Sequence, residues 1–548
     1  MKIKTTLLGF ALLFAMQTMM AQYKISGSIQ DEKTKEPLVG VSIYITDLKT
    51  GTLSNMEGYY QIDKIKPGRY LLDISAVGYK SMVKQITVRS DTSIHFILTP
   101  SVNELNEAIV TGVSRSTELK KSPVIVKTID RTTMMQNSAT NLIDALKNVP
   151  GMSQISTGAS ISKPVIRGLG YNRLITLNNG IRQEGQQWGD EHGIEMDEYA
   201  IDRVEIVKGP GSLMYGSDGI AGVLNFLAPK FPSKGDIKTQ LISNYQSNNQ
   251  LIGYSLSNTG NQKGIQWLGR MSTKWAANYQ NDNDGKVLNS GFREMDVSLM
   301  GGVNKSWGHS HLSISSFQQQ LNLPEGERDS LGRFTFVNAQ GEEVTATSAD
   351  YSGYKTGYPH QDIHHVRLSS NNYFILRKGT LQADFGFQNN KRKEFGNPAD
   401  PNEIDLYFDL RTINYSIRYH AEEIKGWETS LGIGGMQQSH VNKGVDFLIP
   451  AYQLLDAGAF VYTQKSFRKC TIAGGVRLDL RSVRSEALYL DSLGQAVSEP
   501  DAYSELKFSP ISRSYEGFSG SLGVSYAMNT SSTFKLNLSR GFRAPNIA

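Results

Sequence analysis

From about residue 231 onward the sequence alternates between apolar and polar residues, segment after segment. One parity of positions carries Ile472, Gly474, Val476, Leu478 and Leu480, and a later one carries Phe518, Gly520, Leu522, Val524, Tyr526 and Met528. Arg477, Asp479 and Arg481 stand between the first set. A period of two indicates strands with two unlike faces, and charges on one face suit a water-filled lumen better than a protein core. The pattern therefore predicts an antiparallel transmembrane β-barrel, with a soluble β-sandwich as the alternative.

The connections between these segments are unequal in length. The turn 529–532 is short, whereas the segment 322–359 is long and polar. Outer-membrane barrels show this asymmetry. Beyond the first twenty residues no run of 18 apolar residues occurs, which excludes a lipid-spanning helix.

The amino terminus has the layout of a secretory signal peptide. Lys2 and Lys4 precede the apolar run 7–16, and Ala21 offers a cleavage site, so we expect residues 1–21 to be removed on export. The single cysteine, Cys470, excludes an internal disulfide and cysteine-based metal sites.

Residues 22–100 read as several short strands separated by turn signals, which predicts a small β-sandwich. The sequence motifs at Pro37–Val41, Gly58–Ile62 and Pro67–Leu72 resemble those that mark successive strands of the carboxypeptidase-regulatory-like domain. These residues are structural. His95 stands alone without a zinc-ligand set, so a peptidase function is not expected here.

Residues 113–230 predict a mixed α+β unit. The motifs LKNVPGM, PVIRGLGYNRLITLNNGIR and DRVEIVKGPGSLMYGSDGIAGVLNF, in this order, resemble the plug domain of TonB-dependent outer-membrane receptors. The resemblance implies a plug inside a barrel of about 22 strands. It also implies that plug arginines pair with carboxylates of the barrel wall, a role carried here to Arg167, Arg173 and Arg203 together with Glu205. The alternative for these arginines is a place at loop edges.

The linker 101–112 is polar and ends in a short extended apolar piece. Such a segment could add as a strand to a partner sheet, or it could be an ordinary linker strand. The resemblance favours a TonB box here. The predicted contacts with the energy-coupling protein are Leu105, Ala108, Ile109 and Val110.

The stretch 180–200 holds the densest carboxylate cluster of the chain. We interpret it as an outer ligand-contact loop, because carboxylate oxygen and imidazole suit hard and borderline metals; a solvated acidic loop is the alternative. The predicted ligand-binding residues are Glu184, Trp188, Asp190, Glu191, His192 and Glu195. A metal could be held by His192 with His360 and His364, although polar packing of the latter two is equally compatible with the sequence.

The 318 residues from 231 to 548 support about 14 membrane strands at roughly 9 to 11 residues each plus connections. This is fewer than the family's number. The sequence is therefore expected to be a truncated receptor whose partial barrel does not close.

Taken as a whole, the chain is expected to be mainly β, in the order β-sandwich, α+β plug and partial antiparallel transmembrane barrel. The resemblance implies an outer-membrane importer with its first domain and plug on the periplasmic side. Its implied partners are a TonB-type inner-membrane complex, outer-membrane lipid and an extracellular ligand such as a ferric siderophore or another metal complex. A signal-transducing receptor, or an importer of glycan or peptide that works with a surface lipoprotein, remains open.

Several function classes are not expected. The sequence shows no GxSxG elbow, no HExxH and no phosphate-binding loop with its Lys-Ser/Thr pair, so no enzyme is predicted. A resident cofactor is not expected either. With 57 Lys+Arg against 52 Asp+Glu the chain is nearly neutral, and a nucleic-acid partner is not predicted.

Overall fold

A computed structural model describes residues 22–76, 78–100, 108–113, 116–137, 139–185, 189–210, 212–529, 532–545 and 547. The chain divides into two compact units, one of residues 1–108 with 304–308 and one of residues 109–303 with 309–548. Each is described by itself below.

The first unit is a sandwich of two small sheets. One has the order β4-β1-β7, with β8 also paired to β1, and the other has the order β3-β2-β5-β6. Ile25, Ile43, Leu72 and Val88 have no exposed surface and form part of its core. The predicted β-sandwich is confirmed. Its strands are β1 (Tyr23–Asp31), β2 (Ser42–Ile45), β3 (Thr50–Leu53), β4 (Tyr59–Ile65), β5 (Gly68–Ser75), β6 (Met82–Val88), β7 (Thr92–Ser93) and β8 (Phe96–Leu98).

The second unit begins with a mixed sheet of order β11-β16-β17-β14-β15, which we call the plug together with the short elements around it. In this sheet β14 and β17 run parallel, and the hairpin β12-β13 and the pair β9-β10 lie apart from it. The strands of the plug are β9 (Ala108–Ile109), β10 (Thr117–Glu118), β11 (Val126–Asp130), β12 (Met152–Ser156), β13 (Ser162–Ile166), β14 (Leu174–Asn178), β15 (Ile181–Arg182), β16 (Arg203–Lys208) and β17 (Gly222–Leu227).

Short helices complete the plug. They are α2 (Arg131–Gln136), η1 (Asp144–Leu146), η2 (Tyr171–Arg173), η3 (Glu198–Ala200) and α3 (Ser212–Tyr215). Asp130 caps α2, because its side chain accepts a hydrogen bond from the backbone N–H of Thr133. Leu146, Ile166, Val204 and Phe226 are among the buried side chains that join helices and sheet in one core.

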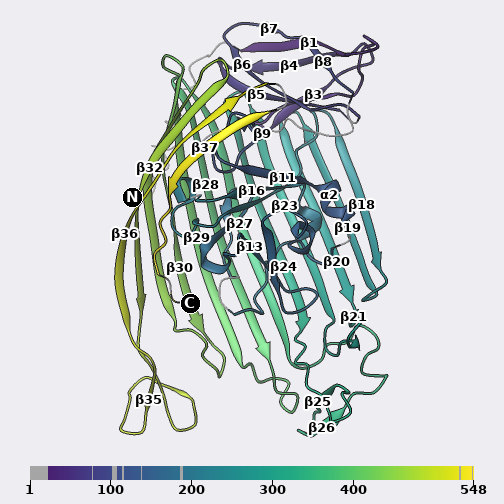
Figure 1. Ribbon diagram of the computed structural model, residues 1–548, viewed down its shortest axis with the longest axis vertical. Helices are drawn as coiled ribbons and strands as arrows, with labels where there is room; N and C mark the ends of the chain where they lie inside the picture. Colours follow the sequence, from purple (N-terminus) through teal and green to yellow (C-terminus); the bar gives the residue numbers. More distant parts are fainter. Residues whose placement is uncertain are drawn as a thin grey trace, which may run out of the picture. The chain divides into compact units, whose positions relative to one another are not determined.

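The rest of the second unit is a 13-stranded sheet, which we call the wall. Its strands follow one another in sequence order, so that each pairs with its neighbours along the chain, and its edge strands in the described residues are β18 and β37. Figure 1 shows plug elements such as β11, β13, β16 and α2 in the hollow of this curved sheet. The strands are β18 (Ile237–Gln246), β19 (Leu251–Gln262), β20 (Ile265–Ala276), β23 (Phe292–Lys305), β24 (Gly308–Asn322), β27 (His360–Leu376), β28 (Gly379–Phe395), β29 (Leu406–Ala421), β30 (Trp427–Asn442), β31 (Tyr452–Ser466), β32 (Cys470–Ser485), β36 (Ile511–Ala527) and β37 (Thr533–Arg540).

The two faces of the wall differ as the alternation predicts. Leu478 is 66% exposed, whereas its neighbour Arg477 is 3% exposed. The same holds along β36 and β37, where Leu522, Phe534 and Leu538 are exposed. In the middle of these strands the wall therefore turns its apolar side chains outward and its charged ones toward the plug. In the described part of the chain no helix is long and apolar enough to cross a membrane.

Connections at one end of the wall are long and carry small sheets of their own. Residues 323–359 join β24 to β27, and residues 486–510 join β32 to β36. We call this the long-connection end; at the other end, for example at 377–378 and 467–469, the turns are short. The loop strands are β21 (Gln280–Asn281), β22 (Gly285–Lys286), β25 (Thr335–Val337), β26 (Glu343–Thr345), β33 (Leu488–Leu490), β34 (Ala496–Val497) and β35 (Glu505–Phe508).

Candidate functional site

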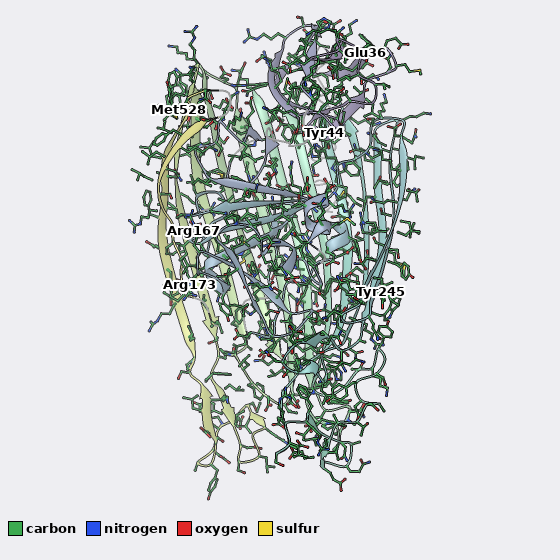
Figure 2. All side chains as sticks on the ribbon, turned by 45° about the vertical axis from the view of Figure 1, so that its right-hand side comes forward. Glu36, Tyr44, Arg167, Arg173, Tyr245 and Met528 are labelled. Atoms are coloured by element: carbon green, nitrogen blue, oxygen red, sulfur yellow. The ribbon has the colours of Figure 1, made fainter. Side chains whose placement is uncertain are left out.

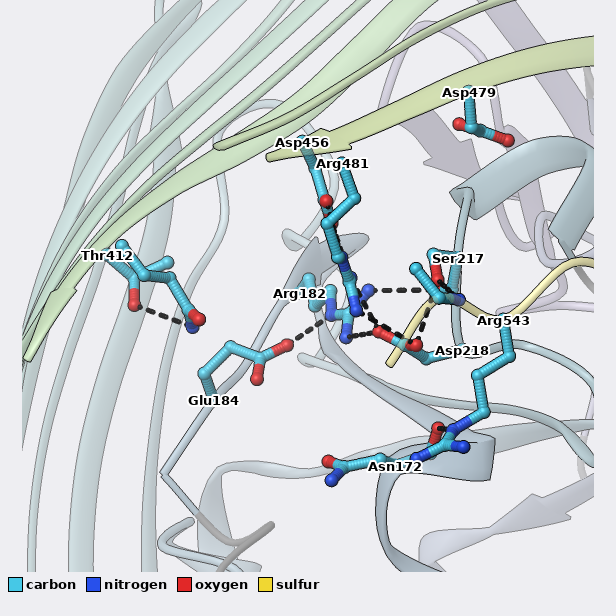
Figure 3. Close-up of polar contacts among 12 residues, drawn as sticks. Asn172, Arg182, Glu184, Ser217, Asp218, Thr412, Asp456, Asp479, Arg481 and Arg543 are labelled. Carbon is cyan, nitrogen blue, oxygen red and sulfur yellow. Dashed lines mark hydrogen bonds and ion pairs between the residues drawn. The ribbon is translucent and has the colours of Figure 1, made fainter. Parts of the chain in front are cut away.

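Asp218 is the centre of an ionic cluster that joins the plug to the wall (Figure 3). It lies in the turn between α3 and β17 with a positive φ of 83°, which a non-glycine residue seldom adopts. Its carboxylate accepts hydrogen bonds from Arg182 at 2.8 Å and from both terminal nitrogens of Arg481 at 2.8 and 3.2 Å. Arg481 also pairs with Asp456 of β31 at 2.6 Å, and Arg182 also pairs with Glu184.

Burial alone would raise the pKa of Asp218, but the charges of Arg481 and Arg182 outweigh it and hold this pKa below its usual range. Asp218 therefore remains a carboxylate although it is only 2% exposed. The segment after β37 supports the same turn. The carbonyl of Phe542 accepts the Asp218 N–H at 3.2 Å, and Ser217 Oγ accepts the Ala544 N–H at 3.0 Å.

A second cluster surrounds Glu195. Its carboxylate contacts His365 Nδ1 at 2.7 Å and Arg392 Nη2 at 2.6 Å, and it accepts a hydrogen bond from Asn390. These partners come from β27 and β28 of the wall. Glu195, His365 and Arg392 are all at least 95% buried, so a buried plug carboxylate again meets a wall cation.

A third cluster lies around Lys274 of β20. Its ammonium group pairs with Glu294 of the wall at 2.8 Å and with Glu198 of the plug at 3.4 Å. Burial raises the pKa of Glu198 to about 7, although Lys274 acts in the opposite direction. Next to it, Ser272 of β20 donates a hydrogen bond to Asp197 at 2.8 Å. The plug is thus fixed to β20, β28 and β32 through its own carboxylates.

The plug arginines named from the resemblance, Arg167, Arg173 and Arg203, are not among the cations of these three clusters. Arg203 pairs at 2.9 Å with Glu205, which lies on its own strand, and Arg167 and Arg173 are exposed (Figure 2). The plug contributes mainly carboxylates to the pairs described above, and the wall contributes arginine and lysine. A carboxylate carries its charge close to the backbone, whereas the longer wall side chains can reach inward across the interface.

Glu205 has another function in the structure. Its carboxylate, with no exposed surface, accepts the backbone N–H groups of Val110 at 3.0 Å and Thr111 at 2.8 Å. Asn225 donates to Thr111 Oγ1 at 2.9 Å, and Tyr215 accepts the Gly112 N–H at 3.2 Å. We call these contacts the entry clamp, because they hold the point at which the linker enters the plug.

Two of the residues predicted to contact the energy-coupling protein, Ile109 and Val110, lie at the entry clamp. Ile109 has no exposed surface and packs with Val113, Val207 and Val223 in the plug core, and Val110 donates to Glu205. Leu105 and the side chain of Ala108 lie outside the described residues. In this conformation strand addition at 109–110 would require the clamp to open.

The predicted ligand-binding residues separate into two groups. Glu184 and Glu195 are buried in the ion pairs described above, whereas Asp190 and Glu191 are exposed. Tyr171 donates to Asp190, and the ammonium of Lys163 lies 4.6 Å from the centre of the Tyr171 ring. Burial lowers the pKa of Lys163 to about 7, and the charge of Arg392 adds to this effect. Trp188 lies outside the described residues.

The predicted metal set is not assembled. His192 is 1% exposed, with Nε2 3.3 Å from Glu394 and its ring 5.6 Å from that of Phe408. His360 stacks on Phe395, and His364 is exposed on the outward face of β27. The pleat sends His364 away from the lumen. Among the described residues, no group of three or more His, Cys, Asp or Glu side chains is placed to hold a metal ion.

Several residues of the interface were not recognised from the sequence, above all Asp218, Arg182, Lys274 and Arg392. The sequence does hold an indication of the role of Asp218. This carboxylate lies inside the glycine-rich turn MYGSDGIAG, and it requires a cationic partner if the turn is buried. Lys274 and Arg392 alternate with outward apolar positions, which places them on the lumen face but does not identify their partners.

Both ends of the plug can be placed along the wall. Lys535 and Ser525, next to the short turn between β36 and β37, donate to the carbonyls of Leu119 at 2.6 Å and Lys120 at 2.6 Å. His192 contacts Glu394 and Phe408, which flank the long connection between β28 and β29. The start of the plug therefore lies at the short-turn end, and the acidic stretch lies at the long-connection end.

Comparison with known proteins agrees with this architecture. Residues 25–110 match the CarboxypepD_reg-like domain, and residues 118–223 match the TonB-dependent Receptor Plug Domain. The iron-regulated outer membrane virulence protein of Vibrio cholerae is 32% identical over 147 residues, which are 26% of this chain and 22% of that protein. The hemin receptor of Yersinia enterocolitica is 33% identical over 119 residues, which are 22% of this chain and 17% of that protein. The aligned part spans about a fifth of the length of these relatives.

Solved structures share the fold at low sequence identity. The ferric-catecholate import receptor Fiu of E. coli K12 superposes with a TM-score of 0.60 at 15% identity, covering 80% of this chain and 72% of that one. The copper transporter OprC gives a TM-score of 0.56 at 16% identity, covering 74% and 61%. At such identities the likeness concerns the fold alone.

Proposed function

We propose, because this chain carries the plug domain of TonB-dependent receptors within an outer-membrane receptor fold, that it imports a scarce ligand across the outer membrane with energy supplied through its linker. The observation that carries the proposal is the polarity of the plug. Its first residues contact the short-turn end of the wall, and its exposed carboxylates lie at the long-connection end. In outer-membrane barrels the short turns face the periplasm and the long loops face outward.

This polarity places energy coupling and ligand binding at opposite ends of the plug. Residues 108–112 precede the plug residues that contact the short-turn end, where an inner-membrane coupling protein could pair with this segment by strand addition. The ligand would be met at the outer end, near Asp190 and Glu191. Between the two ends stand the ionic clusters of Asp218, Glu195 and Glu198, which keep the plug in place at rest.

For the ligand we propose an iron-bearing complex, with a ferric siderophore as the leading case. The names of the relatives support this class, since they include an iron-regulated protein, a hemin receptor and a ferric-catecholate importer. Vitamin B12 and copper transporters also occur among the similar proteins, so these ligands belong in the same test.

The test is uptake by a strain that lacks the gene and carries it on a plasmid. We expect complementation to restore accumulation of a labelled ferric siderophore, and to fail when the coupling protein is deleted or when Val110→Pro removes the Val110 N–H that a strand-addition ladder needs. Binding of the ligand to whole cells should persist with Val110→Pro, because the outer end is untouched. Equal uptake with and without the gene, across siderophores, haem, cobalamin, copper and glycans, would refute import.

The outer carboxylates allow a narrower prediction. Asp190→Asn with Glu191→Gln should weaken ligand binding about tenfold, because one or two charge-assisted contacts are lost at an exposed surface. Titration calorimetry on the purified receptor measures this. His192 is left unchanged, because it is buried against Phe408. Glu422→Gln with Glu423→Gln is the matched control, since these adjacent carboxylates are exposed at the short-turn end; equal affinity in both double variants would mean that the outer loop is merely solvated.

A further inference from the structure

The outward face of the wall carries a group of basic side chains near the long-connection end. Lys391 and Lys393 lie near the end of β28, Arg411 lies in β29, and Lys443 directly follows β30. We call these four residues the outer basic cluster. They share the outward parity of Phe387 and Ile413, which are 40% and 49% exposed, whereas the alternate residues Arg392 and Leu410 are buried.

The strand register brings the four residues together. Lys391 pairs with Asp409, Lys393 with Tyr407, and Asn389 with Arg411. Lys443 lies beside Tyr407, because the backbone N–H of Lys443 donates a hydrogen bond to the carbonyl of Tyr407 at 2.9 Å. The cluster therefore occupies three adjacent strands within a few residues of their ends.

The next outward row toward the middle of the wall is apolar. Leu368, Phe387 and Ile413 stand side by side in the register of β27, β28 and β29, two residues below Asn389 and Arg411. At about 3.4 Å per residue, the cluster begins roughly 7 Å from this row. Because apolar outward residues mark the hydrocarbon region, the basic residues stand at the level of the lipid headgroups. The long connections place them in the outer leaflet.

The cationic side chains of the outer basic cluster lie around Tyr407 and Asp409. The ammonium groups of Lys393 and Lys443 lie 5.2 and 5.3 Å from the centre of the Tyr407 ring. Asp409 is 3% exposed and forms an ion pair with Lys443, and its carboxylate lies 3.8 Å from Arg411 Nε. It therefore orients both cationic side chains. Counting Asp409, the outward Asp362, and Asp405, which precedes β29 with the same parity as Tyr407, four cationic side chains face three carboxylates, and the cluster keeps a formal surplus of one positive charge.

We propose that the outer basic cluster binds the anionic phosphate of a lipid headgroup in the outer leaflet of the outer membrane. Arginine and lysine are the side chains that bind phosphate, and the headgroup region screens charge less than open water does. The acyl chains of such a lipid would lie along Leu368, Phe387 and Ile413. The proposal rests on the orientation of the wall and not on import, so it stands or falls separately from the proposed function.

The test uses the receptor purified from outer membranes, stripped of lipid and placed in nanodiscs of phosphatidylcholine with a minor fraction of phosphatidic acid. Native mass spectrometry then counts the phosphatidic acid molecules that remain bound. We expect the combined variant Lys391→Gln, Lys393→Gln, Arg411→Gln and Lys443→Gln to lower this affinity about tenfold or more. A second combined variant, Lys391→Arg, Lys393→Arg and Lys443→Arg, should retain it, which separates loss of charge from misfolding.

Lys465→Gln is the matched control. Lys465 faces outward at the short-turn end and lies 5.6 Å from the Trp427 ring, so it has a similar lysine–aromatic pair in the opposite leaflet. This control should leave binding unchanged. Equal binding by the glutamine variant would overturn the proposal. Displacement of the lipid by millimolar inorganic phosphate would overturn it as well, because the site would then recognise free phosphate and not a headgroup.

Discussion

Replacing Asp218 by asparagine should destabilise the plug within the wall by about 1.5–3 kcal/mol, because two buried arginines lose their shared counter-charge, although Arg481 keeps Asp456 and Arg182 keeps Glu184. Arg481 and Arg182 both bind this carboxylate at 2.8 Å, and Arg481 is 1% exposed. Asparagine keeps one acceptor oxygen but cannot neutralise either guanidinium. The loss should appear as a lower unfolding midpoint in denaturant and as entry of large antibiotics that the seated plug excludes.

The control for Asp218 is Asp329→Asn, which removes an ion pair with Arg333 in the connection between β24 and β27, outside the plug–wall clusters, and should leave antibiotic exclusion unchanged. A double-mutant cycle with Arg481→Gln gives the coupling energy of the pair directly. Unchanged stability and unchanged antibiotic exclusion for Asp218→Asn would show that this cluster does not hold the plug.

Replacing Glu205 by alanine should open the entry clamp. The Val110 and Thr111 N–H groups lose their buried acceptor, and each orphaned donor costs about 1–3 kcal/mol. Hydrogen exchange of these two amides should accelerate about a hundredfold or more, while the amides of β17 should change little. Arg203 would lose its partner in the same change.

Two further variants check the clamp. Glu205→Gln keeps one acceptor and should give an intermediate exchange rate. Glu118→Ala removes a plug carboxylate whose pair with Lys121 reaches solvent, and it should leave the exchange of Val110 and Thr111 unaltered. Slow exchange of both amides in Glu205→Ala would mean that packing of Ile109 alone retains the segment.

The sequence predicts the layers of this fold well because they depend on local patterns. Alternation in 472–480 identifies the outward face, and the structure exposes Val476, Leu478 and Leu480 there. The sandwich and the plug likewise follow from turn residues and motifs. The 13 strands of the wall are close to the number of about 14 expected from its length.

The interface between plug and wall is less predictable, because its pairs join distant parts of the chain. Glu195 and Asp190 belong to one acidic stretch in the sequence, yet one is buried against Arg392 and the other is exposed. Periodicity assigns Arg481 to the lumen face but cannot indicate that its partner is Asp218. Similarly, the extended piece 108–110 is visible in the sequence, whereas its acceptor Glu205 lies 95 residues from Val110.

The order of strands in the wall also bears on how the protein folds. Each wall strand pairs with the next one along the chain, so the ladder can grow by short loop closures, one hairpin after another. The ion pair of Asp218 with Arg481 instead closes a loop of 263 residues and must wait until β32 has formed. The plug would therefore be attached to β20 and β28 before it is attached to β32, and a delay in β31 or β32 would leave a late intermediate that lacks the Asp218 contact.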